Sequence, residues 1–395
     1  MSPKENRKYE KSHSWIKFSV DLETPDTSLW IMLSECQSKC EHIRDVPILP
    51  ETRKKLNEVY LAKGIHATAA IEGNPLSEED VAAILDDKLQ LPESTKYLQS
   101  EIQNILGVYN DIASKISRGV IPKIDVQLIK EINKKILRDL PVEDNVVPGE
   151  FTDAVVGIRA FNYYGVSPED CEYLVNRLCD WLNGDDFIPQ DQSYRLIYPI
   201  IKAIMAHLYL VWIHPFGNGN GRTARALEFL VLISSGVPAT ASQLLSNHYN
   251  KTRDRYYLEL KRTSESGGKV ASFIKYAVQG FLDGLREQVN EIQNQQWKVV
   301  WKDAAFSIIN SLKSNKETRS RMEILAVSLF GQTSPLSQAQ IAKMQEVVGA
   351  YSKSKQSALR HDIDTLVNEG ILTRNKGKIE AHRELVSGLK NITSS

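Results

Sequence analysis

The chain of 395 residues has 42% hydrophobic and 25% charged side chains, a balance that is ordinary for folded globular proteins and excludes wholesale disorder and a fibrous repeat. Lys plus Arg and Asp plus Glu each number 49, so no net charge draws the whole chain toward nucleic acid or membranes. The polar start and the absence of an apolar run long enough to span a bilayer predict a cytoplasmic protein of two or three domains, without membrane contact.

The N-terminal region, residues 1–105, is predicted to be helical. Apolar residues recur at helical spacing over 28–43 and 51–70, with Pro47 and Pro50 between the two segments. A Ser cap followed by acidic residues predicts another helix over 81–89, and a further helical pattern covers 94–117. Cys36 and Cys40 have the spacing to share a helix face as metal ligands, but no CxxC or His pair accompanies them, so reduced structural thiols fit better.

The middle region, residues 106–290, combines a strand signal with apolar helices. Residues 146–165 read VVPGEFTDAVVGIRAFNYYG, where a Pro-Gly pair, β-branched residues and aromatics predict a strand hairpin. Helical periodicity resumes over 167–182 and 193–213, stops at 214–221 and restarts at once. The pattern predicts an apolar helix, a Gly-rich loop and a second apolar helix.

The C-terminal region, residues 291–395, follows a polar amphipathic helix and a charged, Ser-rich junction. Its helix, turn, longer helix and two short strands predict a winged helix with 352–369 as recognition helix and 371–380 as wing. Basic residues that could contact DNA phosphates are Lys353, Lys355, Arg360, Arg374, Lys376 and Lys378. Asp362, Asp364 and Glu369 dilute this charge, so protein docking and DNA binding both stay open.

The Gly-rich loop has the composition of an anion site. Gly217, Gly219 and Gly221 lead directly into a helix, where unhindered backbone N–H groups and the helix N-terminus can hold phosphate. Arg222 and Arg225 lie one turn apart and could grip separate phosphate groups of a triphosphate.

The same loop offers a base and a metal ligand. His214 ends the preceding helix and could take a proton from an incoming hydroxyl, and Asn218 offers an oxygen to Mg²⁺. The alternative is a tight interhelical turn with solvated arginines. A Rossmann fingerprint is excluded because a helix, not a strand, precedes the glycines.

The whole string from His214 to Arg225, HPFGNGNGRTAR, resembles the Fic family motif HPFx(D/N)GNGRxxR at every defined position. The resemblance implies a mainly α protein: a Fic helical core with a small β-hairpin flap, an N-terminal helical region and a C-terminal winged helix. It also implies transfer of AMP from ATP to a Tyr, Ser or Thr hydroxyl of a target protein or of the chain itself. The implied roles are His214 as general base, Asn218 as Mg²⁺ ligand, Phe216 as loop anchor, and Gly219, Asn220, Gly221, Arg222 and Arg225 as phosphate contacts.

Two further regions gain expected roles from this resemblance. Val155, Val156 and Gly157 would lie in a flap that holds the target backbone as an added strand, although an edge hairpin without a partner is the alternative. Tyr256 and Tyr257 would flank the adenine, although either could instead pack in the core. Three positions depart from the family pattern: Ser264 stands where relatives often have Asn, and Glu150 and Phe151 where an arginine is commoner.

The segment from Thr68 to Asn74, TAAIEGN, resembles the inhibitory pattern (S/T)xxxE(G/N) of many Fic proteins. Glu72 closes a helix that ends at Gly73 and could pair with Arg225, the arginine that the γ-phosphate of ATP would need. The alternative is a solvated glutamate beside a helix-ending glycine. The sequence therefore predicts an adenylyltransferase restrained by Glu72. The rival hypotheses are a DNA-binding regulator whose Fic core senses nucleotide and an enzyme that removes AMP. A homodimer is left open.

Overall fold

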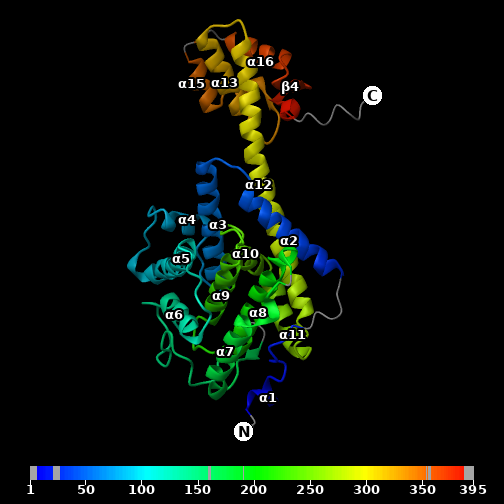
Figure 1. Ribbon diagram of the computed structural model, residues 1–395. Helices are drawn as coiled ribbons and strands as arrows, with labels where there is room; N and C mark the ends of the chain where they lie inside the picture. Colours follow the sequence, from blue (N-terminus) through cyan, green and yellow to red (C-terminus); the bar gives the residue numbers. More distant parts are fainter. Residues whose placement is uncertain are drawn as a thin grey trace. The chain divides into compact units, whose positions relative to one another are not determined.

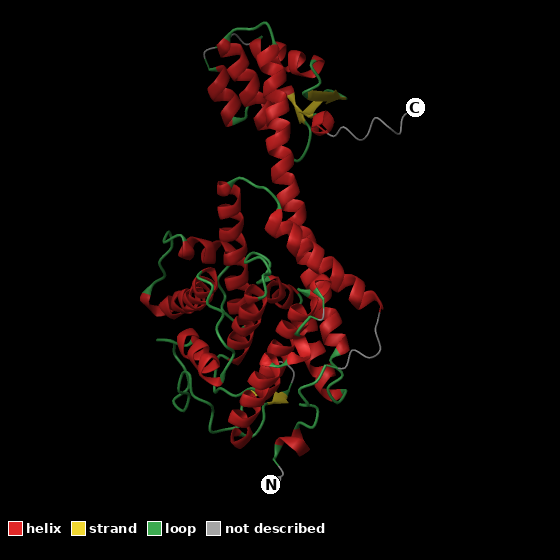
Figure 2. Ribbon diagram, in the orientation of Figure 1, coloured by secondary structure: helices red, strands yellow, loops and turns green. Residues whose placement is uncertain are grey.

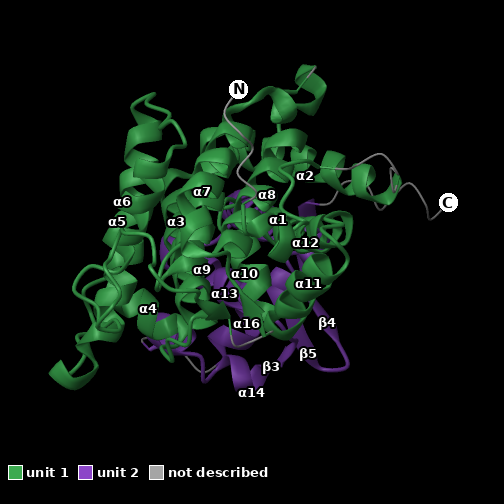
Figure 3. Ribbon diagram, turned by 90° about the horizontal axis from the view of Figure 1, so that it is seen from below, with its two compact units in different colours: residues 1–289 green, residues 290–395 purple. Residues whose placement is uncertain are grey.

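The computed structural model describes residues 7–20, 27–158, 162–189, 191–352, 354 and 357–386. The chain divides into two units, residues 1–289 and 290–395 (Figure 3). Helices dominate both units, and short strands occur in two places (Figure 2), so the predicted mainly α class is confirmed. The predicted limits of a separate N-terminal domain at residue 105 stay a prediction. No described helix combines the length and hydrophobicity needed to cross a bilayer.

Helices α1 to α12 all begin within the described part of the first unit (Figure 1). The α-helices are α1 (Tyr9–Ser12), α2 (Thr27–Asp45), α3 (Pro50–Ile71), α4 (Glu78–Leu85), α5 (Lys96–Ser117), α6 (Val126–Ile136), α7 (Pro168–Asn183), α8 (Ile197–Ile213), α9 (Asn220–Ser234), α10 (Leu244–Lys251), α11 (Arg253–Glu265) and α12 (Ala271–Ser311). Short 3-10 turns are η1 (Glu93–Thr95), η3 (Asp185–Phe187) and η4 (Gln192–Tyr194).

The core of this unit is built on α8 and α9, which pack against each other along their length. Almost every residue of α8 is buried, as expected for a helix that is apolar on all sides. Helices α3, α5 and α6 pack against α9, and α2 and α7 pack against α8. Cys36 and Cys40 lie buried in α2, where burial raises the pKa of the Cys40 thiol to about 12. The loop between α8 and α9 is therefore held by the most buried part of the fold.

Local signals explain several helix boundaries. Ser77 and Asp80 form a reciprocal capping box at the start of α4. The predicted helix over 81–89 ends four residues early, because the chain turns at Asp87, whose φ is 57°. The side chain of Asp125 accepts a bond from the Leu128 N–H and starts α6.

The predicted hairpin over 146–165 is shorter than expected. Only β1 (Gly157–Ile158) and β2 (Tyr163–Tyr164) pair, antiparallel, with Gly157 opposite Tyr164. The earlier part of the segment finds other partners: Gly149 turns at φ 85° and donates its N–H to Asn133, and Phe151 bridges to Phe216. Backbone groups satisfied by a helix and the loop cannot also form a ladder, so the strands are limited to the far end.

The second unit contains the last part of α12, then α13 (Lys316–Phe330), β3 (Leu336–Ser337), α14 (Gln338–Ile341), α15 (Gln345–Tyr351), α16 (Ala358–Asn368), β4 (Leu372–Asn375), β5 (Lys378–Ala381) and the 3-10 turn η5 (Arg383–Val386). The strands form an antiparallel sheet in the order β3-β5-β4. Buried side chains such as Trp301, Ile363 and Ile379 form its own core. This helix and strand order is that of a winged helix. The recognition helix, predicted over 352–369, forms only as α16.

Candidate active site

The loop between α8 and α9 forms one wall of a cavity of about 940 Å³. The backbone reaches it through two left-handed residues, His214 at φ 53° and Gly219 at φ 76°, and α9 begins immediately afterwards at Asn220. A side chain at Gly221 would collide with the carboxylate of Glu72. The loop therefore needs glycine both for its turn and for the close approach of the segment that carries Glu72. The lining comprises Ile71, Glu72, Glu143, Val156, Gly157, Ile158, Asn162, Tyr163, Tyr164, His214, Gly217, Asn218, Gly219, Asn220, Gly221, Arg222, Arg253 and Tyr257.

Two asparagine side chains fix the shape of the loop. Asn220 accepts a bond from the Phe216 N–H at 2.9 Å and donates to the Phe216 carbonyl at 2.7 Å. Buried Asn133 of α6 donates to the Asn218 carbonyl at 3.0 Å and to the Thr223 hydroxyl at 3.2 Å. Sequence reasoning missed Asn133, although an amide among the apolar positions of an amphipathic helix is a signal of this kind. The side chain of Asn220, predicted to contact ATP, is used for loop geometry.

His214 is half-buried at the loop entrance and lines the cavity. Burial lowers the pKa of its imidazole to about 4, against smaller raising effects from the Val211 carbonyl and Glu72. Its Nδ1 lies 3.3 Å from the Val211 oxygen, and because a carbonyl only accepts, the Nδ1 carries the hydrogen in that bond. The Nε2 then holds a lone pair, as a proton acceptor requires.

Arg225 is buried and binds the end of α3. Its Nη2 donates to Glu72 at 2.7 Å and to the Thr68 carbonyl at 3.1 Å, and its Nε donates to the Thr68 hydroxyl at 3.2 Å. Burial raises the pKa of Glu72, but the charges of Arg225 and Arg222 outweigh this effect and the net shift is downward, so the carboxyl is ionised. The structure thus brings together the predicted pair of Glu72 and Arg225.

Arg222 has a carboxylate of its own, which sequence reasoning did not identify. Its Nη1 donates to Glu101 of α5, and its Nη2 donates to the Asn218 side-chain oxygen at 2.9 Å. The other oxygen of Glu101 accepts from Asn74 at 2.8 Å. Both arginines of the loop are therefore paired with acids, one from α3 and one from α5.

The two tyrosines of α11 have different surroundings. Tyr257 lines the cavity beside Arg253, and both donate to the Ile71 carbonyl, at 3.4 Å and 2.6 Å. Tyr256 is buried away from the cavity, where its hydroxyl lies 2.9 Å from the Nε2 of His207. Ser264 lies in a separate hollow of about 320 Å³. Only Tyr257 of the predicted adenine pair faces the site, and Arg253 is an additional lining cation.

Two of the three hairpin residues that were predicted to hold the target backbone lie at the cavity. Val156 and Gly157 line the cavity, whereas Val155 is exposed outside it. On the other side, the Nε2 of His13 lies 2.9 Å from the Tyr164 carbonyl of β2. Among the described residues, β1 pairs with no strand other than β2. The outer edge of β1 is thus the edge available to an added strand.

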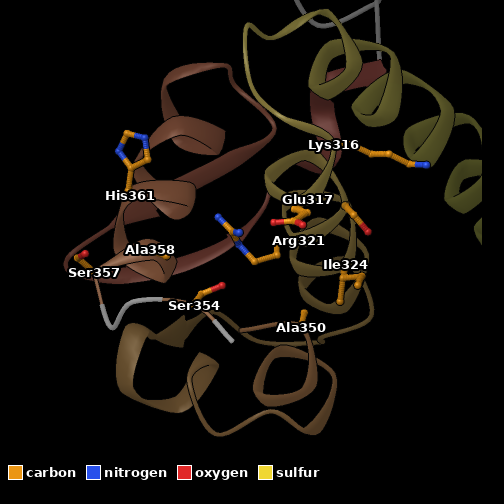
Figure 4. Close-up of a pocket in the computed structure, with 10 residues that line it drawn as sticks. Lys316, Glu317, Arg321, Ile324, Ala350, Ser354, Ser357, Ala358 and His361 are labelled. Carbon is orange, nitrogen blue, oxygen red and sulfur yellow. The ribbon is translucent and has the colours of Figure 1, made fainter. Parts of the chain in front are cut away.

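The second unit also contains a cavity, of about 1020 Å³, between α13 and α16. Figure 4 shows Arg321 extending into it, with His361 directed away. Of the predicted DNA contacts, Lys353 and Lys355 lie outside the described residues. Arg360 and Arg374 both face Asp364, at 4.0 Å and 2.6 Å. Asp364 thereby offsets charge that DNA phosphates would need, and DNA binding stays a prediction.

Comparison with known proteins identifies relatives of the middle of the chain. Residues 123–232 match the Fic/DOC family model. The chain is 28% identical over 249 residues to protein adenylyltransferase fic-1 of Caenorhabditis elegans, across 61% of this chain and 45% of that protein. It is 30% identical over 241 residues to protein adenylyltransferase Fic of Culex quinquefasciatus, across 60% of this chain and 43% of that protein. The matched regions thus cover less than half of these two relatives.

A solved structure resembles the fold of most of the chain. The crystal structure of a Fic family protein from Desulfovibrio desulfuricans aligns with a TM-score of 0.53 and 16% identity, covering 88% of this chain and 94% of that one. At this identity the likeness concerns the fold alone. The family match thus falls on residues 123–232, which carry the hairpin and the loop with its flanking helices, and this region is similar to the Fic/DOC family.

Proposed function

We propose that this protein transfers AMP from ATP to a hydroxyl of a polypeptide, which is either a target protein or the chain itself. The observation that carries the proposal is a half-buried His214, kept neutral by its lowered pKa, beside a glycine loop that opens α9 and in one cavity with Arg222. Relatives that share this region are named protein adenylyltransferases. Tyr257 and Arg253 would contact the base, and the outer edge of β1 would hold the target backbone.

The reaction follows from these positions. The Nε2 of His214 takes the hydroxyl proton while the hydroxyl oxygen attacks the α-phosphorus of ATP. The bond between the α-phosphorus and the bridging oxygen breaks, and pyrophosphate leaves with the electron pair. Backbone N–H groups at the start of α9 and the two arginines stabilise the phosphate charge.

The residues present fit a magnesium ion that enters with the nucleotide. Mg²⁺ commonly takes one or two protein oxygens and completes its shell with phosphates and water. The Asn218 side-chain oxygen would be one ligand, and it now accepts from Arg222. The Glu143 carboxylate, 3.3 Å from the Asn218 amide nitrogen, would be a second. The ion would neutralise phosphate charge during transfer.

Glu72 would restrain this activity. The γ-phosphate and Glu72 would compete for Arg225, so full ATP binding requires the end of α3 to release it. A coupling of this kind is typically worth about 5-fold to 150-fold in affinity. We therefore expect Glu72→Gly to label itself or a target more strongly than the parent protein.

The test uses ATP labelled at the α-phosphate, with Mg²⁺, followed by denaturing electrophoresis. We expect label in the Glu72→Gly variant and a loss of roughly 100-fold or more when His214→Ala is added. His361→Ala, at an exposed position in the second unit, is the matched control and should keep the label. Label that survives His214→Ala would contradict the proposal. Label that first appears and then declines with time would favour AMP removal by the same site.

A further inference from the structure

The acid that pairs with Arg222 differs in origin from the acid that pairs with Arg225. Glu101 lies on α5, whereas Glu72 closes α3. The two are linked through Asn74, which lies two residues beyond Glu72 and donates to Glu101 at 2.8 Å. Asn74 is itself fixed, because it also donates to the Leu98 carbonyl at 3.2 Å and accepts from the Leu76 N–H at 3.1 Å. The short segment from Glu72 to Asn74 therefore contacts Arg225 directly, through Glu72, and Arg222 indirectly, through Asn74 and Glu101.

The guanidinium of Arg222 is held by two hydrogen bonds and has one N–H donor that is unpaired among the described residues. Glu101 and Asn218 each accept from one of its terminal nitrogens, while its Nε is buried without a hydrogen-bond partner among the described residues. A buried donor without an acceptor is unfavourable, so an acceptor that reaches it would be stabilised. Arg222 also lines the cavity. Its held orientation and spare donor suit a phosphate oxygen.

Glu101 cannot move aside as Glu72 can. Its side chain is 11% exposed, against 30% for Glu72, and each of its oxygens already has a partner. A carboxylate leaving a buried pair must regain water, and only the more exposed one has water beside it. Glu101 is therefore placed to orient Arg222 permanently rather than to gate it.

We propose that Glu101 is a positioning residue for Arg222 and that Asn74 holds Glu101 in place. The segment between α3 and α4 then has two opposite effects on nucleotide binding: Glu72 blocks Arg225, and Asn74 supports Arg222. This inference rests on the proposed function, in which the γ-phosphate takes Arg225, and it places the β-phosphate at Arg222. It predicts that replacing Asn74 weakens nucleotide binding, whereas replacing Glu72 strengthens it.

The experiment measures affinities for MgATP, MgADP and AMP by titration calorimetry in the Glu72→Gly background. Adding Glu101→Gln or Asn74→Ala should weaken MgATP and MgADP by about 10-fold, as expected when a charged hydrogen bond is disturbed, and leave AMP unchanged. Asp362→Asn is the matched control: it also changes a buried acid of an acid–arginine pair to an amide, in the second unit, and should change no affinity. Thermal melting verifies that each variant is folded.

Several outcomes would overturn the inference. Tighter or unchanged MgADP binding in either variant means that Glu101 does not position Arg222. An equal loss for AMP means a general structural role. Stronger labelling by Asn74→Ala alone, in the chain with Glu72 intact, means that Asn74 is only part of the inhibitory contact. If the background variant binds MgATP without transferring label, the proposed function fails while the positioning role is still measured. If it binds no nucleotide, both fail.

Discussion

The loop site of the first unit and the core of the second unit each contain a buried acid–arginine pair, and the two are arranged in opposite ways. In the loop site the Arg225 side chain is 0% exposed and its acid, Glu72, is 30% exposed. In the second unit the acid, Asp362, is 1% exposed and Arg321 is 18% exposed. Asp362 also accepts from the Tyr351 hydroxyl at 2.9 Å.

The difference indicates which partner can be replaced. Around Asp362, the arginine and the tyrosine compensate a carboxylate that has no access to water. Around Arg225, a cation is permanently buried and its accessible acid can leave, provided that another anion arrives. The exposures at Arg225 are those expected of an anion site whose acid can be displaced, as proposed above, and the exposures at Asp362 are those of a structural pair.

The largest effect is expected where the buried acid loses its cation. Arg321→Ala should destabilise the second unit by about 3–5 kcal/mol, because Asp362 stays buried without its cation. Hydrogen exchange of α13 and α16, followed by mass spectrometry, measures the loss. Saturating MgATP should restore none of it. Protection that is unchanged in these helices would show that Asp362 does not depend on Arg321.

In the loop site the loss should be reversible by ligand. Glu72→Gly leaves Arg225 buried without its acid, so the variant should melt at a lower temperature than the parent protein. MgATP at about 100 times its dissociation constant should then return roughly 2.7 kcal/mol. The parent protein should gain less at the same concentration, because Glu72 must first be displaced. Equal stabilisation of both proteins would contradict competition for Arg225.

Glu228, one turn beyond Arg225 in α9, provides a third case: a buried acid that forms no salt bridge among the described residues. Burial raises the pKa of its carboxyl to about 8, against lowering effects from the Tyr249 hydroxyl bond and Arg225. Because the folded pKa exceeds the unfolded one, stability is full at acidic pH and falls as pH rises toward about 8.

Glu228→Gln should remove this dependence. As pH rises between the unfolded and folded pKa values, the parent loses stability and the variant does not. The difference between their free energies of unfolding should therefore grow by about 1.4 kcal/mol per pH unit. Urea denaturation of both proteins at several pH values measures the difference. A difference that stays constant across this range would show that Glu228 is ionised in the folded protein.

The smallest effect concerns His214. Its pKa of about 4 leaves the imidazole unprotonated at neutral pH, and the rate of label transfer should fall only as pH drops toward that value. We therefore expect an almost flat rate in Glu72→Gly from about pH 5.5 to about pH 8. Single-turnover rates measure it. A tenfold drop near pH 6 would indicate an imidazole with an ordinary pKa.

Much of the site could be predicted because its chemistry is local in sequence. The segment from His214 to Arg225 contains the proposed base, the glycines and both arginines within about three helical turns. Glu72 was found for a similar reason, since its motif is short and contiguous. The hairpin was overestimated because β-branched and Pro-Gly residues indicate extended chain but not which backbone groups will pair.

The sequence by itself determined the helical class, the loop that opens α9 and the acid that pairs with Arg225, because these follow from periodicity and from short contiguous motifs. Only the tertiary structure decided that Tyr257 faces the cavity while Tyr256 is buried, and that Glu101 and Asn74 hold Arg222. Glu101 and Arg222 are separated by 121 positions, and their contact depends on how α5 packs against α9. Spacing along a chain does not encode a contact of that kind.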